Sequence, residues 1–347
     1  MSGLSRSSGT VGRQVHGGNG RVVARAFGMD PSQVLDLSFS ANPFAPDPTP
    51  IVTAHLARGV LRRYPDALDV DRATRALATA IGVDARRVLI TNGGAEAIAL
   101  VATVLGRGWV EDPDFSLYRR HLRRLDPAGP RFRSDPHNPS GALASPGERA
   151  DVWDEAFYPL ATGRWSRLSR RADSGARQPD PLILGSLTKV FACPGLRLGY
   201  VVVPGDDGEA LGVGDLMGHL KRAQARWAVS TLALASLCDL LEGADLTRWA
   251  EAIRAARADL VALLARYGLR ARPSDANFVL VDDVPGLAAA LAAQGVVVRD
   301  CSSFGLPSAV RIAVPDGAGL ARLEQALEAV LDRSRAGTWR SLAREGL

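Results

Sequence analysis

The chain has 347 residues, a hydrophobic fraction of 46%, a mean hydropathy close to zero and a formal net charge of +5. This length can bury a large core in about two domains, and no apolar run is long enough for a membrane-spanning helix. The basic residues are scattered without interleaved aromatics, so an anionic small molecule is a better candidate partner than nucleic acid. The polar N-terminus lacks a secretory signal, which favours the cytoplasm, and three distant cysteines predict neither a disulfide framework nor a metal site.

The N-terminal segment is predicted to be mostly irregular. Residues 1–14 are rich in Ser, Gly and Arg and are expected to form a flexible tail. The glycines of His-Gly-Gly at 16–18 would let the backbone approach a ligand, although the segment in isolation is better explained as an ordinary loop. A strand is expected at 35–40, and the proline-rich stretch 43–50 is interpreted as a linker.

A candidate anion site follows in the next part of the chain. Helices are predicted at 51–61 and 70–80, and a buried strand is predicted at 87–91. Asn-Gly-Gly at 92–94 then leads into a helix at 95–102. Free N–H groups and the helix dipole point outward at such a turn, and without a dinucleotide or P-loop motif the expected anion is a single phosphate.

The remaining chain alternates between strands and helices. Elements are expected in the following order: strand 107–111, a turn cluster at 135–141, an exposed loop at 162–178, strands 181–184 and 198–203, helices 215–242 and 245–267, strand 277–281, helix 286–293, strands 296–299 and 309–314, and helix 317–333. This pattern predicts an α/β fold with a mostly parallel sheet, helices on both of its faces, and a domain boundary near 240.

Lys189 is the residue most informative about chemistry. The chain has 42 lysine and arginine residues, of which only Lys189 and Lys221 are lysines. Arginine does not give up its proton, whereas a desolvated lysine becomes a neutral amine that can form a Schiff base. Chance explains two surviving lysines, but the serine, threonine and arginine around Lys189 favour a chemical role.

These segments together resemble the fold type I pyridoxal 5′-phosphate enzymes, in the branch of histidinol-phosphate aminotransferase and threonine-phosphate decarboxylase. The similarity covers roughly residues 14–333. It rests on Ser-x-Thr-Lys and Pro-Gly-Leu-Arg-Leu-Gly-Tyr within 186–200, with Asn-Pro-Ser-Gly at 138–141 and Asp-Glu-Ala-Phe at 154–157. The resemblance implies a large domain with a mostly parallel central sheet and a smaller α/β domain.

The same resemblance implies a division of the chain into five segments. These are a tail at 1–14, an arm at 15–50 that packs with the small domain, the large cofactor-binding domain at 51–240, the small domain at 241–335 and a second tail at 336–347.

The resemblance also assigns residues to the cofactor ring. Lys189 would bind the cofactor as a Schiff base and move the α-proton, which makes it the catalytic residue. Asp154 would pair with the protonated ring nitrogen, Asn138 would bond to the phenolic oxygen and Phe115 would stack on the ring. Each of these three residues also has a purely structural explanation. Asp154 could be a solvated loop acid, Asn138 a turn residue before proline, and Phe115 a core aromatic.

The cofactor phosphate would be bound by backbone N–H groups, hydroxyls and one guanidinium. The implied residues are Gly94, Ala95, Glu96, Ser186, Thr188 and Arg197. Arg197 could instead form a structural ion pair. Tyr64, in Arg-Tyr-Pro-Asp, would reach the phosphate of a neighbouring subunit, so the resemblance implies a homodimer with shared active sites.

Other residues are assigned to the substrate. Arg311 lies where the family binds the substrate carboxylate, although a structural salt bridge would also offset its desolvation. The other implied substrate-binding residues are His16, Gly17, Gly18 and Asn42. The His-Gly-Gly segment and the Arg-Asp-Cys-Ser-Ser-Phe run at 299–304 resemble the decarboxylase branch more than the aminotransferase.

The chain departs from the family in its middle. Only 22 residues separate Phe115 from Asn138 and 15 separate Asn138 from Asp154, where the family has longer connections. Pro146-Gly147 argues against a helix there. Asp135 replaces an asparagine common in the family, and Phe157 replaces the tyrosine of the aminotransferases. The central domain is therefore expected to be shortened.

Two classes of function are compatible with this sequence. The first is a pyridoxal-phosphate enzyme for a small phosphorylated amino acid or amine, either threonine-phosphate decarboxylase of cobalamin biosynthesis or histidinol-phosphate aminotransferase of histidine biosynthesis, with 2-oxoglutarate and glutamate as partners. The second is a degenerate member that keeps the fold and binds without turnover. The retention of Lys189, Asp154, Asn138 and Arg197 favours the enzyme.

Overall fold

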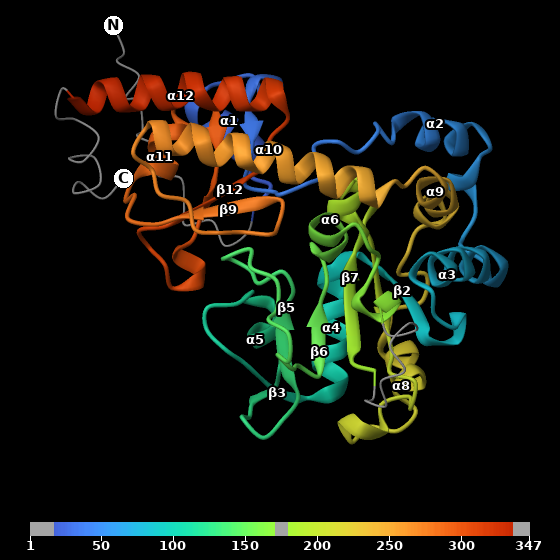
Figure 1. Ribbon diagram of the computed structural model, residues 1–347. Coiled ribbons are helices and arrows are strands. Elements are labelled where there is room, and N and C mark those ends of the chain that lie inside the picture. Colours follow the sequence, from blue (N-terminus) through green and yellow to red (C-terminus); the bar gives the residue numbers. More distant parts are fainter. Residues whose placement is uncertain (1–16, 171–179, 336–347) are drawn as a thin grey trace, which may run out of the picture. The chain divides into compact units, whose positions relative to one another are not determined.

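The computed structural model describes residues 17–170 and 180–335, which fold into two units. The central unit comprises residues 41–255 and 274–277. The terminal unit comprises the described residues up to 40, together with 256–273 and those from 278 onward. The chain passes from the central to the terminal unit within helix α10 (Leu246–Arg266) (Figure 1).

A seven-stranded sheet forms the middle of the central unit, in the order β2-β8-β7-β6-β5-β3-β4. The strands are β2 (Val88–Asn92), β3 (Arg107–Val110), β4 (Arg124–Leu125), β5 (Arg131–Ser134), β6 (Val152–Asp154), β7 (Leu182–Ser186) and β8 (Leu198–Val202). Strands β3 to β7 are mutually parallel, and β8 runs antiparallel to both β7 and β2. The predicted mostly parallel sheet is therefore confirmed.

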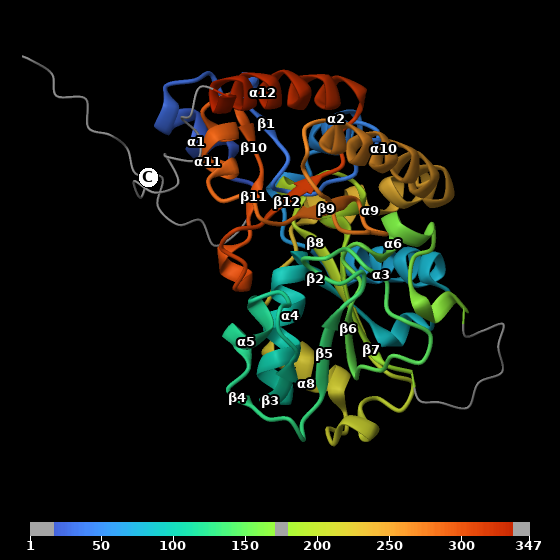
Figure 2. The same ribbon diagram turned by 60° about the vertical axis from the view of Figure 1, so that its left-hand side comes forward.

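Helices cover both faces of this sheet (Figure 2). Successive strand side chains point to opposite faces, so Val88 and Ile90 of β2 join one core while Leu89 joins the other. The helices of the unit are α2 (Thr49–Ala57), α3 (Ala67–Ile81), α4 (Gly93–Leu105), α5 (Leu117–His121), α6 (Tyr158–Thr162), α7 (Leu187–Val190), α8 (Leu216–Ala223) and α9 (Thr231–Glu242). Helices α3 and α9 cover the first face, and α4, α5 and α8 cover the second.

Local signals explain where these helices begin and end. Asp66 and Asp69 form a capping box at the start of α3, and Gly82 ends the helix in a left-handed conformation. The single helix predicted at 215–242 is wrong, because residues 224–230 separate α8 from α9. The Gln224 side chain donates instead to the Ile90 carbonyl, and Ser230 caps the new helix.

The middle of the central unit is short, as the residue spacing predicts. Within the described stretch 135–151 there is no helix, and the chain passes from β5 to the neighbouring parallel strand β6 through turns alone. The exposed loop predicted at 162–178 is wrong in its first half, because Trp165 and Leu168 pack against the core. Residues 171–179 of that loop lie outside the described residues.

The terminal unit contains two small sheets. Strands β9 (Phe278–Val281), β11 (Arg299–Asp300) and β12 (Val310–Ala313) form an antiparallel sheet, whereas β1 (Leu35–Asp36) and β10 (Val296–Val297) pair in parallel. The helices are α1 (Gly20–Phe27), α11 (Leu287–Ala292), α12 (Gly317–Arg335) and the second half of α10. No helix in the described part of the chain is long and apolar enough to cross a membrane.

Candidate functional site

The carboxyl ends of the parallel strands bring the predicted ring-binding residues together. Ser134 ends β5 and Asp154 ends β6, and the two residues are directly paired across the sheet. Lys189 lies in the short helix α7 that follows β7. Lys189 is close enough to Asp154 to lower the pKa of that carboxyl group. Ligands of open α/β sheets bind at this end of the strands.

Asp154 has defined donors. The Tyr118 hydroxyl donates to its Oδ2 at 2.8 Å, and the Ala156 N–H donates to its Oδ1 at 3.0 Å. Burial, with a smaller contribution from nearby Asp114, raises the pKa of Asp154 to about 6, and the two hydrogen bonds and Lys189 act in the opposite direction. Asp154 is therefore a held, desolvated acid and not a solvated loop acid.

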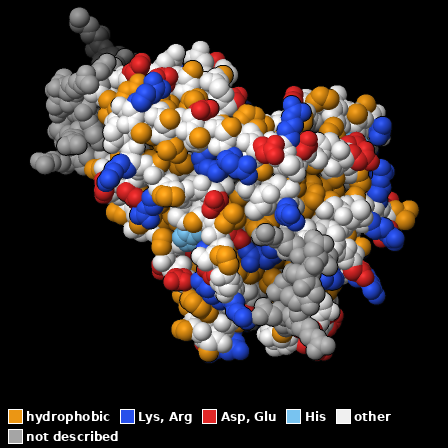
Figure 3. Space-filling model, in the orientation of Figure 1, with side chains coloured by type: hydrophobic (Ala, Val, Ile, Leu, Met, Phe, Trp, Pro, Cys, Tyr) orange, Lys and Arg blue, Asp and Glu red, His pale blue; other side chains and the backbone are white. Residues whose placement is uncertain are grey.

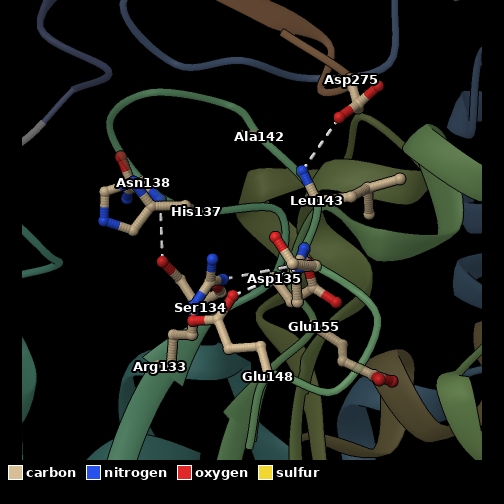
Figure 4. Close-up of polar contacts among 12 residues, drawn as sticks. Arg133, Ser134, Asp135, His137, Asn138, Ala142, Leu143, Glu148, Glu155 and Asp275 are labelled. Atoms are coloured by element: carbon tan, nitrogen blue, oxygen red, sulfur yellow. Dashed lines mark hydrogen bonds and ion pairs between the residues drawn. The ribbon is translucent and has the colours of Figure 1, made fainter.

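Asp114 joins the segment of Phe115 to the turn of Asn138. The Ser134 hydroxyl donates to Asp114 Oδ1 at 2.6 Å. The same hydroxyl accepts from the Asn138 N–H at 2.8 Å (Figure 4). Asp114 also accepts from the Phe115 N–H at 2.6 Å. Burial raises the pKa of Asp114 to about 6. No local pattern singles out Asp114, because its role depends on contacts with Ser134, 20 residues later.

Phe115 and Tyr118 form an aromatic pair beside these acids. Their rings meet edge to face, with centroids 5.9 Å apart, and Phe115 is only partly buried. Burial raises the pKa of Tyr118, so its hydroxyl stays protonated and donates to Asp154. Tyr118 thus contacts both Phe115, the predicted stacking residue, and Asp154, the predicted ring acid.

The predicted phosphate-binding groups converge at the start of α4. A Cβ atom added to Gly94 would lie 3.1 Å from Ser186 Cβ, and one added to Gly93 would lie 2.5 Å from Arg197 Nη2. The close packing of the helix start on β8 depends on Gly199, where a Cβ atom would lie 2.4 Å from the carbonyl carbon of Gly93. The Asn92 side chain does not cap α4, so the first-turn N–H groups remain available to an anion.

The remaining members of the predicted phosphate site are placed as follows. Arg197 is exposed, has a left-handed backbone conformation (φ 57°) and forms no ion pair with the described carboxylates. Buried Thr188 donates its hydroxyl to the Leu198 carbonyl at 3.4 Å. Ala95 and Glu96 lie in the first turn of α4, and the Glu96 carboxylate accepts from the Asn92 N–H at 2.6 Å.

Asn42 is placed against the lysine segment. Its N–H donates to the Lys189 carbonyl at 2.9 Å, and its side-chain amide donates to the Val190 carbonyl at 3.1 Å. Its Oδ1 accepts from the Phe44 N–H at 3.0 Å. The buried Asn42 side chain therefore holds the backbone that carries Lys189.

In the terminal unit, Ser38 brings three predicted substrate residues together. A Cβ atom at Gly17 would lie 2.2 Å from the Ser38 carbonyl oxygen, so only glycine allows this approach. The Gly18 N–H donates to Ser38 Oγ at 2.9 Å, and Arg311 Nη2 donates to the Ser38 carbonyl at 3.4 Å. His16, the fourth predicted residue of this group, lies outside the described residues.

Arg299 is a further candidate binding residue, which the sequence placed only within the run at 299–304 and assigned no binding role. It lies on β11 directly opposite Arg311 on β12, and both residues are buried. Burial lowers the pKa of Arg311 to about 10, and Arg299 contributes to that shift. Arg299 Nη2 donates to Ser303 Oγ at 2.9 Å. In the sequence, Arg299 directly follows three valines, and a charged residue at the end of an apolar strand suggests a binding role. Only the strand register shows that Arg299 is paired with Arg311.

The comparisons with known proteins place the chain in a family. The family model "Aminotransferase class I and II" matches residues 134–330. The histidinol-phosphate aminotransferase of Halobacterium salinarum is 30% identical over 89% of this chain and 94% of its own length. The threonine-phosphate decarboxylase of Salmonella typhimurium is 30% identical over 91% of this chain and 96% of its own length. The chain belongs to the class I and II aminotransferases.

A solved structure supports the same assignment at the level of the fold. The histidinol-phosphate aminotransferase of Sinorhizobium meliloti, in complex with pyridoxal-5′-phosphate, aligns with a TM-score of 0.74 and 19% identity. The alignment covers 96% of this chain and 99% of that chain. The expected fold type I architecture is thereby confirmed.

This aminotransferase-family chain is an enzyme, and the cofactor implied by its motifs is pyridoxal 5′-phosphate. Its own residues fit that group. The glycine-lined start of α4 is open to a phosphate beside Arg197, and a desolvated acid lies near Lys189. Phe157, at the position of the aminotransferase tyrosine, is buried and offers no hydroxyl. Within the described residues, no cluster of three potential ligands suggests a metal ion.

Proposed function

We propose that this enzyme acts on a small phosphorylated amino acid or amine, with decarboxylation of threonine phosphate as the first candidate reaction. Transamination of histidinol phosphate, with 2-oxoglutarate as amino acceptor, is the second. The observation that carries this proposal is the buried pair Arg299 and Arg311 on adjacent strands. The relatives' names, which specify phosphorylated amino compounds, support the same substrate class.

The paired arginines suit a substrate with two anionic groups. Desolvation lowers the pKa of both side chains, and the two cations repel each other across the strands. A substrate carboxylate at Arg311 and a substrate phosphate at Arg299 would offset the desolvation of the two guanidinium groups and their mutual repulsion. Ser38 holds Arg311 beside Gly17 and Gly18, so the glycine segment would close over the same anions.

The residues of the central unit would carry out the reaction. Pyridoxal phosphate, when bound, supplies an aldehyde that condenses with amines and a ring that accepts the electron pair released at the α-carbon. The Lys189 amine would move the proton at that carbon. Ionised Asp154 would stabilise a positive charge on the ring nitrogen, and Tyr118 would hold the carboxylate in place.

Two features favour decarboxylation over transamination. The Cys-Ser-Ser-Phe run at 301–304 surrounds Arg299, because Ser303 accepts its hydrogen bond and the Phe304 ring lies 5.6 Å from its guanidinium. Phe157 also lacks the hydroxyl expected at this position in the aminotransferases.

A two-substrate assay tests this proposal. The purified protein with pyridoxal phosphate is expected to convert threonine phosphate to aminopropanol phosphate and carbon dioxide, measured by mass spectrometry. Histidinol phosphate with 2-oxoglutarate is the parallel assay, with glutamate as its product. The Arg299→Gln variant is expected to raise KM for the phosphorylated substrate by at least about tenfold, because a charge-assisted contact is lost. Turnover of neither compound, with turnover of unphosphorylated amino acids, would contradict the proposal, and no turnover at all would support a binding protein.

We also propose that the enzyme is a homodimer with shared active sites. Four large apolar side chains are exposed within residues 61–70, and exposed Trp227 contacts one of them; they are Leu61, Tyr64, Leu68 and Val70, and together with Trp227 they are called the apolar face. Figure 3 shows apolar side chains at the surface over α2 and α3. Tyr64, 71% exposed, stacks on Trp227 at 4.4 Å, beside a hollow of about 680 Å³ that the partner subunit would fill. From this face, the Tyr64 hydroxyl would reach the partner's cofactor phosphate.

Disruption of this apolar face is expected to produce monomers. In sedimentation velocity, wild type should sediment as a dimer at micromolar concentration, and Trp227→Ser should shift the boundary toward the monomer, because an exposed aromatic anchor is lost. Leu125→Ser, which removes an equally exposed apolar side chain on β4, is the matched control and should leave the dimer intact. A monomeric wild type, or a dimeric Trp227→Ser variant, would argue against the proposed interface.

A further inference from the structure

One guanidinium connects the two segments that carry the ring-binding residues. Arg167 donates from Nε to Glu155 Oε1 at 2.9 Å and from Nη2 to Asp135 Oδ2. Its backbone N–H donates to the same Glu155 oxygen at 3.1 Å. The guanidinium also lies 3.4 Å above the ring centre of buried Trp153. These contacts hold Arg167 in one orientation.

Both carboxylates adjoin a predicted ring-binding residue. Glu155 directly follows Asp154, and its N–H donates to the Leu184 carbonyl at 2.8 Å. Asp135 begins the turn that leads to Asn138. Its N–H donates to the Asp154 carbonyl at 2.8 Å, and its Oδ1 accepts from the Ala144 N–H at 2.8 Å. Figure 4 shows Asp135 and Glu155 close together, with the turn of Asn138 beyond them.

The charge balance of this cluster depends on Arg167. Asp135 and Glu155 are both almost completely buried. Burial raises the pKa of Glu155 to about 7 and raises that of Asp135, while Arg167 acts against both shifts. Without Arg167, the carboxylates of Asp135 and Glu155 would be buried without this counter-charge, which would lower the free energy of unfolding.

The other arginine near this cluster does not make the same connection. Arg133 lies 4.0 Å from Asp135 Oδ1, and its Nε pairs with Glu148. Its guanidinium lies 5.5 Å from the Trp153 ring, on which Arg167 packs more closely. Arg167 alone among the described arginines bonds to both Asp135 and Glu155.

We propose that Arg167 is a positioning residue that fixes Asn138 and Asp154 relative to each other, in place of the longer connection that this chain lacks. No helix occurs within the described stretch 135–151, and the backbone pairing of β5 with β6 ends at Asp135, whose N–H donates to the Asp154 carbonyl. Beyond that bond, the position of the Asn138 turn relative to Asp154 depends on side-chain contacts. Asp135 provides the carboxylate that Arg167 requires. The inference rests on the proposed function, because it concerns the residues that would contact the cofactor ring.

Three variants test this role. Arg167→Gln removes the charge, and Arg167→Lys keeps the charge but cannot bond to two carboxylates with one planar fork. The double variant Arg167→Gln with Asp135→Asn replaces the ion pair with two amides that can bond to each other. Arg164→Gln, three residues earlier and exposed, is the matched control.

Each variant is measured in three ways. Thermal unfolding without cofactor reports folding, equilibrium dialysis gives the Kd for pyridoxal phosphate, and steady-state assays give kcat and KM separately. Arg167→Lys is expected to fold and to bind the cofactor about tenfold more weakly, and Arg167→Gln about 10- to 100-fold more weakly, because the two segments lose their common partner. We expect kcat to fall with little change in substrate KM, partial recovery of affinity in the double variant, and wild-type values for Arg164→Gln.

The possible outcomes separate this inference from the proposed function. If wild type binds pyridoxal phosphate and both single variants bind it equally well, the positioning role is wrong while the proposed function stands. If the variants lower only the unfolding temperature, with kcat and cofactor Kd unchanged, Arg167 is purely structural and the inference is again wrong. A wild-type protein that does not bind the cofactor overturns both.

Discussion

Replacement of Lys189 by alanine is expected to lower turnover by at least about 10³-fold, because the variant loses both the amine that binds the cofactor and the group that moves the α-proton. Lys189 is close enough to Asp154 to lower the pKa of its carboxyl group, and it follows the strand that carries Ser186. In wild type, borohydride reduction after addition of pyridoxal phosphate should attach the cofactor to the peptide containing Lys189. Mass spectrometry and the visible absorbance of the bound cofactor both measure this result.

The second lysine provides a matched control for this prediction. Lys221 is exposed on α8, and Lys221→Ala should keep the cofactor band and wild-type turnover. Lys189→Arg should fail like Lys189→Ala, since arginine keeps its charge and does not supply a neutral amine. Wild-type cofactor attachment and activity in Lys189→Ala would refute the catalytic role of this residue.

Replacement of Asp154 by asparagine is expected to lower activity while increasing the stability of the cofactor-free protein. Turnover should fall by about 10²-fold or more, because a neutral amide cannot stabilise a positive charge on the ring nitrogen. The amide oxygen can accept from the Ala156 N–H and the amide NH2 can donate to the Tyr118 hydroxyl oxygen, so local geometry should be retained. Steady-state kinetics at saturating pyridoxal phosphate measure the loss.

The stability gain should depend on pH in a defined direction. Burial raises the pKa of Asp154 from 3.8 to about 6, so the folded state retains a proton that the unfolded chain has released. The contribution of the Asp154 carboxyl group to the free energy of unfolding is therefore lost as pH rises from about 4 to about 6. Below this pH range, the free energy of unfolding of Asp154→Asn should show no pH-dependent gain over that of wild type. Above the range, it should exceed the wild-type value by about 1–3 kcal/mol.

Urea unfolding of the cofactor-free proteins at several pH values tests this prediction. Asp114 and Glu155, whose pKa values are also raised by burial, titrate in both proteins, so the difference between variant and wild type reports Asp154 together with its coupling to Asp114. Asp259→Asn, an exposed substitution on α10, is the control for the replacement of one carboxylate by an amide. A pH-independent difference for Asp154→Asn, or a loss of stability above pH 6, would refute this account.

The sequence by itself determined the family, the fold class and the order of the chemical groups. The Ser-x-Thr-Lys segment, the Asn-Gly-Gly turn before α4 and the Asp-Glu-Ala-Phe segment each combine a local backbone pattern with a characteristic side chain. A glycine turn at a helix start makes an anion site from local geometry alone. Such features are encoded within a few residues, which is why they could be recognised without a structure.

The tertiary structure alone decided which distant groups meet. Tyr118 and Asp154 are 36 residues apart, Arg167 and Asp135 are 32 residues apart, and Arg299 faces Arg311 through strand register. Local patterns do not encode such pairs, because strand register and the path between strands determine them. The residue spacing showed that the middle of the chain is short. The folded chain shows that one arginine, in a segment expected to be an exposed loop, spans the two strand ends there.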